Sequence, residues 1–236
     1  LDIQYYISMP SWVPCKLEQH YGNILMPSKN PAPCQLTVKY GNIEGGSFEQ
    51  PLQLEAKYSN VTLGALQSAD FDLGYCGKVI LESASQLNAD SKYSNLKAGE
   101  IGSLALDLKY GQLEAEKVQS ADVDVKYSTC KIGYLVDEVA AESLDYSTLE
   151  LDAVNAKFQK IQVEARYSAV KLALPSSASF RVKGEDLKYG HCKLLGFEPT
   201  KSEKEKDAVY YEVNGGKNGS IYFDAGGFSN MNIRKE

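Results

Sequence analysis

The sequence predicts an all-β protein: a single-stranded β-solenoid, or β-helix, of about ten coils of 17–22 residues with a cap at each end. A Tyr-small dipeptide recurs along most of the chain, and apolar residues alternate on the N-terminal side of each copy. In addition, the decapeptide QSADFDLGYC, which begins at Gln67, has a near copy, QSADVDVKYS, which begins at Gln119. Similarity at a short, regular period is the signature of stacked repeats, in which each coil meets nearly the same environment as its neighbour.

The repeated tyrosine fixes the length of the coil. Ten of the sixteen tyrosines occupy this position, at spacings of 17 to 22 residues. They are Tyr21, Tyr40, Tyr58, Tyr75, Tyr93, Tyr110, Tyr127, Tyr146, Tyr167 and Tyr189.

Each copy contains two short strands that meet at the dipeptide. Before Tyr110, Leu106 and Leu108 alternate with polar residues, and Leu113 and Ala115 alternate after it. This period of two is typical of strands with one buried face. The alternation shifts by one residue at the dipeptide, which predicts a corner or bulge there. Such short repeats leave no room for a helical crossover, so neighbouring coils should pair in parallel. An antiparallel sandwich is the alternative, but it would not keep one dipeptide in register ten times.

The repeated tyrosines lie two and four residues after the apolar positions of the strand, so the alternation places them on the same, inward face. We therefore expect a stacked aromatic ladder at a corner of the core, with the hydroxyls at its rim. The alternative is an outward ladder, whose rings could stack against sugars.

Two charged columns should run along the outside. Seven of ten residues directly before the Tyr are basic and eight of ten residues three before it are acidic. In the middle coils they are Asp72, Asp90, Asp107 and Asp124 beside Lys92, Lys109 and Lys126. The columns can simply balance charge, or they can form a flat polar face that binds a repeating polymer or divalent cations. The glycine-rich calcium repeat of other solenoids is absent, which weakens the cation interpretation.

The cysteines allow one pairing. Cys15 and Cys34 both lie six residues before their Tyr and should stack in adjacent coils. They could form a disulfide, although a pair of buried thiols is the favoured interpretation. No cysteine spacing matches a zinc site, and we expect no metal.

Signals for catalysis are weak, and we expect no catalytic residues and no cofactor. The histidines, His20 and His191, belong to opposite ends of the predicted rod. There is no GxSxG, HExxH or phosphate-loop motif. Some solenoids cleave polysaccharides with acidic residues on one face, so a polysaccharide lyase or hydrolase is the enzymatic alternative.

We expect one domain whose coils, residues 15–195, lie between a cap of residues 1–14 and a cap of residues 196–236. Tyr210–Val213 and Ser220–Ala225 should form a hairpin turned by residues 214–219. The charge run from Lys201 to Asp207 should be a solvated loop.

Overall charge argues against nucleic acid as a partner, because 25 basic residues face 31 acidic ones, for a net charge of -6. No window of the sequence approaches a membrane span. We interpret the chain, which begins at Leu1, as one from which a signal peptide has been removed.

The repeated pattern resembles a family. Asp107 to Ala115, DLKYGQLEA, and Asp124 to Ile132, DVKYSTCKI, look like the repeats of a bacterial adhesin family of unknown function. The resemblance covers roughly residues 15–195 and implies a right-handed β-solenoid at the cell surface or in the periplasm. It carries no catalytic signature.

The sequence therefore favours an exported, non-enzymatic binding module or scaffold that is at most peripheral to a membrane. A glycan, or a host or envelope protein, is the expected partner. A structural role in an envelope complex is a further alternative.

Overall fold

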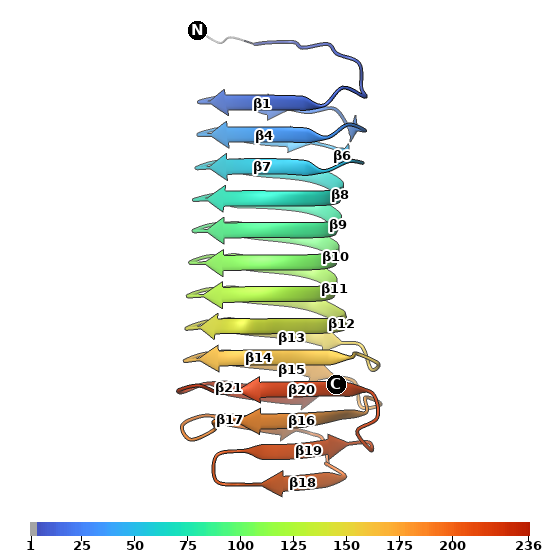
Figure 1. Cartoon of the computed structure of the whole chain (residues 1–236), viewed down its shortest axis with the longest axis vertical. Coiled ribbons are helices and arrows are strands. Elements are labelled where there is room, and N and C mark those ends of the chain that lie inside the picture. The colour runs from blue at the N-terminus through green and yellow to red at the C-terminus, as the bar shows by residue number, and fades with distance from the viewer. Residues whose placement is uncertain (1–3) are drawn as a thin grey trace.

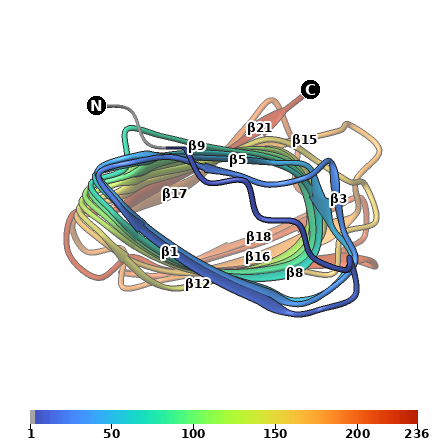
Figure 2. The ribbon, with the colours of Figure 1, turned by 90° about the horizontal axis from the view of Figure 1, so that it is seen from above.

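A computed structural model describes residues 4–236 and shows a right-handed β-solenoid (Figure 1). Strands stack in parallel along the rod, and in Figure 2 the chain turns clockwise as it moves away from the viewer. Within the described residues there is no helix that could cross a membrane. The fold class predicted from the repeat is confirmed.

The front sheet of Figure 1 begins with short strands and continues through long ones that also supply the back sheet. Its first strands are β1 (Cys15–His20), β4 (Cys34–Lys39) and β7 (Leu52–Lys57). The long strands are β8 (Asn60–Gly74), β9 (Lys78–Lys92), β10 (Asn95–Lys109), β11 (Gln112–Lys126) and β12 (Thr129–Asp145). The remaining N-terminal strands are β2 (Ile24–Leu25), β3 (Lys29–Asn30), β5 (Asn42–Gly45) and β6 (Ser47–Phe48).

Neighbouring coils pair residue by residue in the register that the tyrosine repeat predicts. Leu106 aligns with Val123, and Lys109 aligns with Lys126. Between the two sheets lies one continuous apolar core, in which Leu36, Leu73, Leu108 and Val125 have almost no exposed surface.

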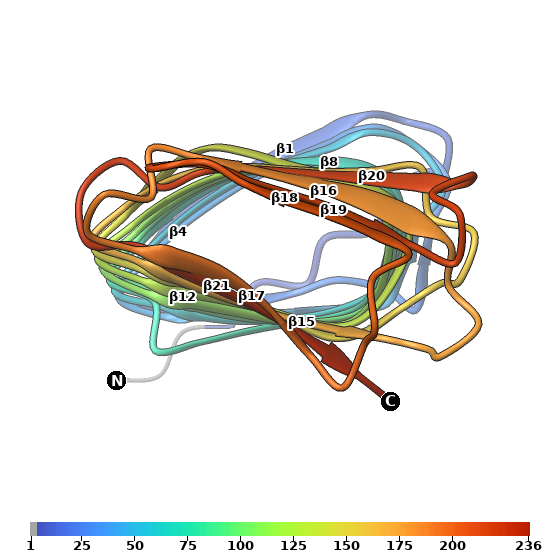
Figure 3. The same cartoon turned by 90° about the horizontal axis from the view of Figure 1, so that it is seen from below.

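The C-terminal coils are not stacked in chain order (Figure 1; seen from below in Figure 3). The strands involved are β13 (Thr148–Val154), β14 (Lys160–Arg166), β15 (Ala169–Leu174), β16 (Phe180–Glu185), β17 (His191–Leu195), β18 (Lys201–Lys204), β19 (Val209–Val213), β20 (Gly219–Asp224) and β21 (Asn230–Lys235). Strand β20 pairs in parallel with both β14 and β16, and β21 pairs with both β15 and β17. The last coil of the chain therefore lies between two earlier coils.

This arrangement corrects the predicted C-terminal cap. Residues 210–213 and 220–225 do not form a hairpin, because β19 pairs antiparallel with β16 and β18 while β20 pairs elsewhere. The charge run is not simply a loop either, because Lys201–Lys204 is the edge strand β18. The hairpin that closes the front sheet is β18–β19. At the other end, residues 4–14 cross above the first coil without forming a strand (Figure 2).

Candidate functional site

The acidic and basic residues singled out in the sequence form two vertical columns on the outer face of the front sheet. Register pairing places Asp72, Asp90, Asp107 and Asp124 in four consecutive coils. Lys92, Lys109 and Lys126 follow one another in the same way. Parallel pairing brings together positions that lie 17 or 18 residues apart, and the alternation of the strand points both columns outward.

Two of the aspartates are neutralised within their own coil. The Nζ atom of Lys109 lies 2.7 Å from Oδ2 of Asp107, and that of Lys92 lies 3.1 Å from Oδ2 of Asp90. The hydrogen bond that Lys109 donates to Asp107, followed by the charge of that carboxylate, raises the pKa of Lys109. Exposed pairs of this kind contribute only about 0–1 kcal/mol each. At these coils the columns act mainly as a charge-balanced surface.

The second carboxylate oxygen of each of these aspartates has no partner. Oδ1 of Asp90 and Oδ1 of Asp107 are shielded from solvent and make no hydrogen bond within the described residues. Shielding also makes these two oxygens poor acceptors for an incoming ligand unless the side chain turns.

Unpaired acidic charge lies at two other places on the same face. Asp72 and Asp124 are exposed, and within residues 4–236 neither has a cationic group within 4.0 Å. Gly74 stands where most coils carry Lys, while Lys126 turns toward Asp145 at 3.8 Å. Asp70 and Asp122 lie two residues before these aspartates and are also exposed, and Asp70 accepts a hydrogen bond from Nδ2 of Asn88 at 3.2 Å. The front face therefore carries two acidic patches, Asp70/Asp72 and Asp122/Asp124, separated by two balanced coils.

The tyrosine ladder exists, but it faces outward. From Tyr21 to Tyr167 the successive ring centroids lie 4.7 to 5.1 Å apart and the rings are within 5° of parallel. From Tyr40 to Tyr167 each member is about half exposed. The expectation of an inward ladder was wrong because all nine ladder tyrosines from Tyr21 to Tyr167 have a positive φ, between 49° and 58°. A left-handed residue at the corner turns its side chain out of the inward phase.

The same stacking limits what the ladder can bind. Each ring covers the face of the next, so the ladder presents ring edges and a row of hydroxyls to solvent. Sugars stack on the faces of aromatic rings, and within the ladder those faces are occupied. The outward-ladder alternative is therefore right about direction, but the internal rings cannot stack against sugars.

A phenylalanine completes the ladder where the coils leave chain order. Phe228, in the inserted last coil, lies 5.9 Å from Tyr167 and 5.0 Å from Tyr189 between ring centroids. It therefore fills the level between them. Sequence reasoning missed Phe228 because the residue is Phe instead of Tyr and follows Tyr189 only after the long C-terminal detour of the chain, although Ser229, Met231 and Ile233 repeat the usual pattern after it.

A second ordered charge pattern, which sequence reasoning also missed, lies on the back sheet. Signs alternate along one column, and register pairing places Lys97, Glu114, Lys131, Glu150 and Lys171 in five consecutive coils. Alternation leaves this face balanced, in contrast to the acidic patches in front.

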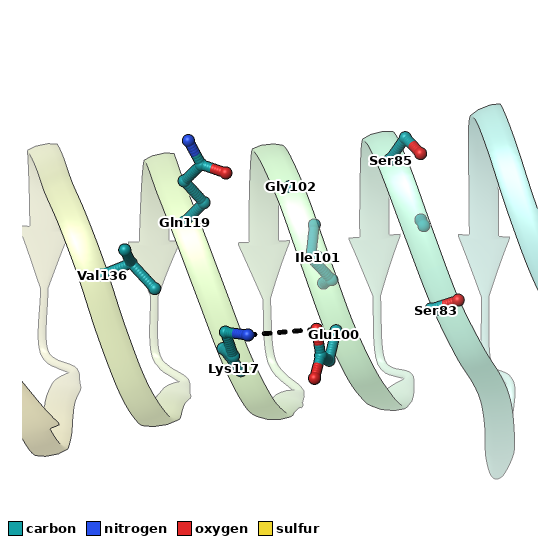
Figure 4. A pocket seen from close by; sticks show the side chains of 9 residues that line it. Ser83, Ser85, Glu100, Ile101, Gly102, Lys117, Gln119 and Val136 are labelled. Carbon is teal, nitrogen blue, oxygen red and sulfur yellow. Dashed lines mark hydrogen bonds and ion pairs between the residues drawn. The ribbon is translucent and has the colours of Figure 1, made fainter.

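Two surface hollows lie away from the columns of the front sheet, and Figure 4 shows the first of them. One of about 460 Å³ lies at the corner between the sheets, where Ser83, Ser85 and Gly102 leave space. The ion pair between Glu100 and Lys117, 3.2 Å long, lies beside it. Another hollow, of about 300 Å³, is lined by residues such as Lys78 and Asn95 on the back sheet. Neither contains histidine or cysteine among its lining residues.

The sulfur atoms of Cys15 and Cys34 lie 3.1 Å apart, and all five cysteines are free thiols. Burial, followed by the neighbouring Cys15, raises the pKa of Cys34 to about 12. Burial also raises the pKa of Cys130 to about 12. Such thiols are poor nucleophiles because the thiolate is the reactive form.

The two histidines lie at opposite ends of the rod, as the repeat predicts. Nε2 of His20 is 3.2 Å from Glu18, and Nε2 of His191 is 3.2 Å from Asn232. Across residues 4–236, no three His, Cys, Asp or Glu side chains are grouped so that they could hold a metal ion.

Comparison with known proteins gave no match to a family model, to a curated protein or to a solved structure. The fold defines the class of protein as a β-solenoid. The resemblance to a bacterial adhesin family remains a hypothesis that the repeat suggests.

Proposed function

We propose that this solenoid is an exported, non-enzymatic binding module, adhesin-like in use, whose front sheet engages an extended, repeating polymer such as a glycan. The observation that carries the proposal is the face itself. Its outward residues align from coil to coil, and carboxylates without an ion-pair partner among residues 4–236 recur at Asp70/Asp72 and again at Asp122/Asp124. An extended periodic ligand could make the same contact at both patches, which lie three coils apart, so that weak contacts add.

Hydroxyl groups of a neutral glycan are suitable donors to such carboxylates. Charged hydrogen bonds are roughly twice as strong as neutral ones, which favours the unpaired patches over the balanced coils between them. The row of tyrosine hydroxyls along the adjacent corner adds further donors and acceptors. The cell surface or periplasm is the proposed location, since a module of this kind needs access to polymers outside the cell.

The test is binding of the purified chain to an array of glycans and extracellular-matrix proteins, with and without calcium. A selective hit should weaken at least tenfold in Asp107→Lys/Asp124→Lys, because one change removes an acceptor and both reverse the local charge. The matched control is Glu82→Lys/Glu116→Lys beside the corner hollow and away from the front sheet, which alters net charge equally on exposed residues. The control should bind like the unaltered chain.

Three results would contradict the proposal. Equal loss in both variants would mean that overall charge, rather than the front face, governs binding. A blank array would favour a scaffold or a structural part of an envelope complex. Release of reducing ends or unsaturated sugars from the same glycans would instead support the enzymatic alternative.

A further inference from the structure

The two ends of the front sheet are finished differently. At the C-terminal end, β18 is an antiparallel strand of sequence KSEK with four exposed residues. Its Lys201 and Glu203 pair with each other at 2.8 Å. Charged residues on an edge strand discourage pairing with another chain. The lower end of the front sheet is therefore protected from further strand addition.

The N-terminal end has no such protection. Strand β1 pairs with β4 alone, so its upper edge has no strand against it among the described residues. Leu17 is only half-buried, whereas Leu36, its counterpart one coil below, is fully buried. Tyr21 is 80% exposed, against 51% for Tyr40. The first coil thus has no neighbouring coil above it among the described residues, whereas every internal coil has one on each side.

Apolar side chains gather over the same end. Residues 4–14 contain no charged residue and cross the mouth of the first coil (Figure 2). Exposed members of this stretch include Tyr5, Tyr6, Ile7 and Trp12. Contiguous exposed apolar groups of this kind mark contact surfaces.

The free edge of β1 has a defined set of unpaired backbone groups. The amides of Cys15 and Tyr21 donate to carbonyls of the coil below, at 3.1 and 2.9 Å. Because alternate residues of a strand point to opposite neighbours, the N–H and C=O groups of Lys16, Glu18 and His20 point away from β4. These three residues are the ones that can exchange hydrogen bonds with an added strand.

We propose that the N-terminal end binds the same end of a second copy, with the two β1 strands antiparallel about a twofold axis. Antiparallel pairing that uses the free groups can place Lys16 opposite Glu18 of the second copy, with Leu17 opposite Leu17. It can instead place Glu18 opposite Glu18. The first register is favoured, because opposite charges that face each other across strands stabilise a sheet and like charges destabilise it.

The first register also suits both faces of the sheet. Each interface contains two Lys16–Glu18 pairs on the outer face and one Leu17–Leu17 contact on the inner face. The contact covers Leu17, which is only half-buried in the single chain. A twofold axis perpendicular to the sheets keeps both front faces on one side. The product is a closed dimer instead of a filament, since the charged β18 edge lies at both outer ends.

Residues 4–14 must shift aside for this contact, because they pass above β1 (Figure 1). Within residues 4–236, the hydrogen bonds of this stretch are internal: Val13 N donates to Pro10 O at 3.1 Å and Tyr6 Oη to Gln4 Oε1 at 2.9 Å. The shift therefore breaks no hydrogen bond to the first coil. It also brings the exposed aromatic side chains beside the joint, where a second copy can cover them.

The test is the molar mass of the full chain in solution, measured by light scattering and sedimentation across a range of concentrations at low salt. The unaltered chain should dimerise. Lys16→Glu alone and Glu18→Lys alone should each raise the dimer dissociation constant roughly tenfold or more, because both cross-strand pairs become like-charged. The double variant Lys16→Glu/Glu18→Lys should dimerise again. A mixture of the two single variants should form the mixed dimer.

A chain that stays monomeric at all concentrations would overturn the proposal. If both single variants dimerise as tightly as the unaltered chain, the proposed pairing of Lys16 with Glu18 is wrong and the contact lies elsewhere. Circular dichroism of each variant checks that the fold is kept. The charge-swapped double variant gives a second check, because a folding defect would not be repaired by a second surface change. The result is independent of glycan binding.

Discussion

At the scale of the residue, the least expected feature is that nine tyrosines adopt a left-handed backbone conformation, which favours glycine. For a residue with a β-carbon this conformation costs roughly 1–2 kcal/mol. Offsetting it, each internal ring stacks on two neighbours, and an aromatic pair contributes about 0.5–1.5 kcal/mol. Stacking therefore makes tyrosine acceptable at a corner where sequence reasoning would have expected glycine.

This balance makes a prediction for Tyr110, which lies 4.9 Å from Tyr93 and 5.1 Å from Tyr127 between ring centroids. Tyr110→Ala loses both stacking contacts and keeps the backbone strain. Tyr110→Gly loses the same contacts but relieves the strain, so it should be about 1 kcal/mol more stable than Tyr110→Ala. Tyr110→Phe keeps the ring and should be close to neutral. Urea unfolding measures all three, and an alanine variant as stable as the glycine variant would contradict the strain argument.

At the scale of the element, the corner depends on buried hydroxyls behind the ladder. Oγ of Ser147 donates to the carbonyl of Asp145 at 2.7 Å and accepts the amide of Ser128 at 3.1 Å. The hydroxyl of Ser168 does the same for the amide of Ser147 at 3.0 Å. These bonds join consecutive coils at the point where the chain leaves one strand and enters the next.

Removing one such hydroxyl should therefore cost more than a surface change. Ser147→Ala leaves a buried amide without its acceptor, and we expect a loss of about 1–3 kcal/mol in the free energy of unfolding. Ser103→Ala is the matched control, because Ser103 is exposed on the front sheet, and it should change stability by less than about 0.5 kcal/mol. Thermal and urea unfolding provide the comparison. Equal effects would mean that the corner hydroxyls are dispensable.

The first two strands of the front sheet offer a redox test. The thiols of Cys15 and Cys34 lie 3.1 Å apart, and oxidised glutathione can convert them to a disulfide with release of two reduced glutathiones. A bond that closes a loop of this length should stabilise the chain by about 3 kcal/mol. Mass spectrometry under both redox conditions detects the bond, and Cys15→Ser should abolish the gain. No change in mass after oxidation would leave the favoured interpretation, a stable thiol pair.

The sequence repeat predicts which residues align in neighbouring coils, but it does not predict side-chain direction at the corners or the choice of ion-pair partner. The spacing of the tyrosines gave the register directly, which is why Asp90 and Asp107 could be placed side by side. Whether the tyrosine side chains point inward or outward could not be predicted from the alternation of inward and outward residues. That alternation holds for extended strand residues and fails at a residue with a left-handed φ. The choice of ion-pair partner was not predictable either, because Lys126 turns to Asp145 of the next coil instead of Asp124 of its own.

At the scale of the whole molecule, the inserted last coil could not be predicted either. A repeat implies contact with the next copy along the chain, whereas residues 219–235 fill a level that the chain skips between Leu174 and Phe180. The two ends of the solenoid thereby become unlike. The N-terminal coil is held from one side, while the C-terminal coils are joined by a segment that arrives last in the sequence.

This topology predicts that stability is divided along the rod. Phe223 is fully buried in the inserted coil and lies between Val163 and Gly184 of the two coils that it joins. Phe223→Ala should remove about 3–5 kcal/mol at that point. Solenoid coils contact only their neighbours, so the loss should uncouple residues 180–213 from the rest before the central coils unfold.

Hydrogen exchange detects this division by segment. In Phe223→Ala, amides of β16 and β19 should exchange faster, while those of β9 to β11 keep their protection. The matched control is Leu106→Ala in a central coil, where Leu106 is buried and contacts coils that follow in chain order. It should lower protection around its own coil and leave β19 unchanged. Uniform loss of protection in Phe223→Ala would mean that the rod unfolds as one cooperative unit. The contacts of the inserted coil would then be as strong as the contacts between central coils.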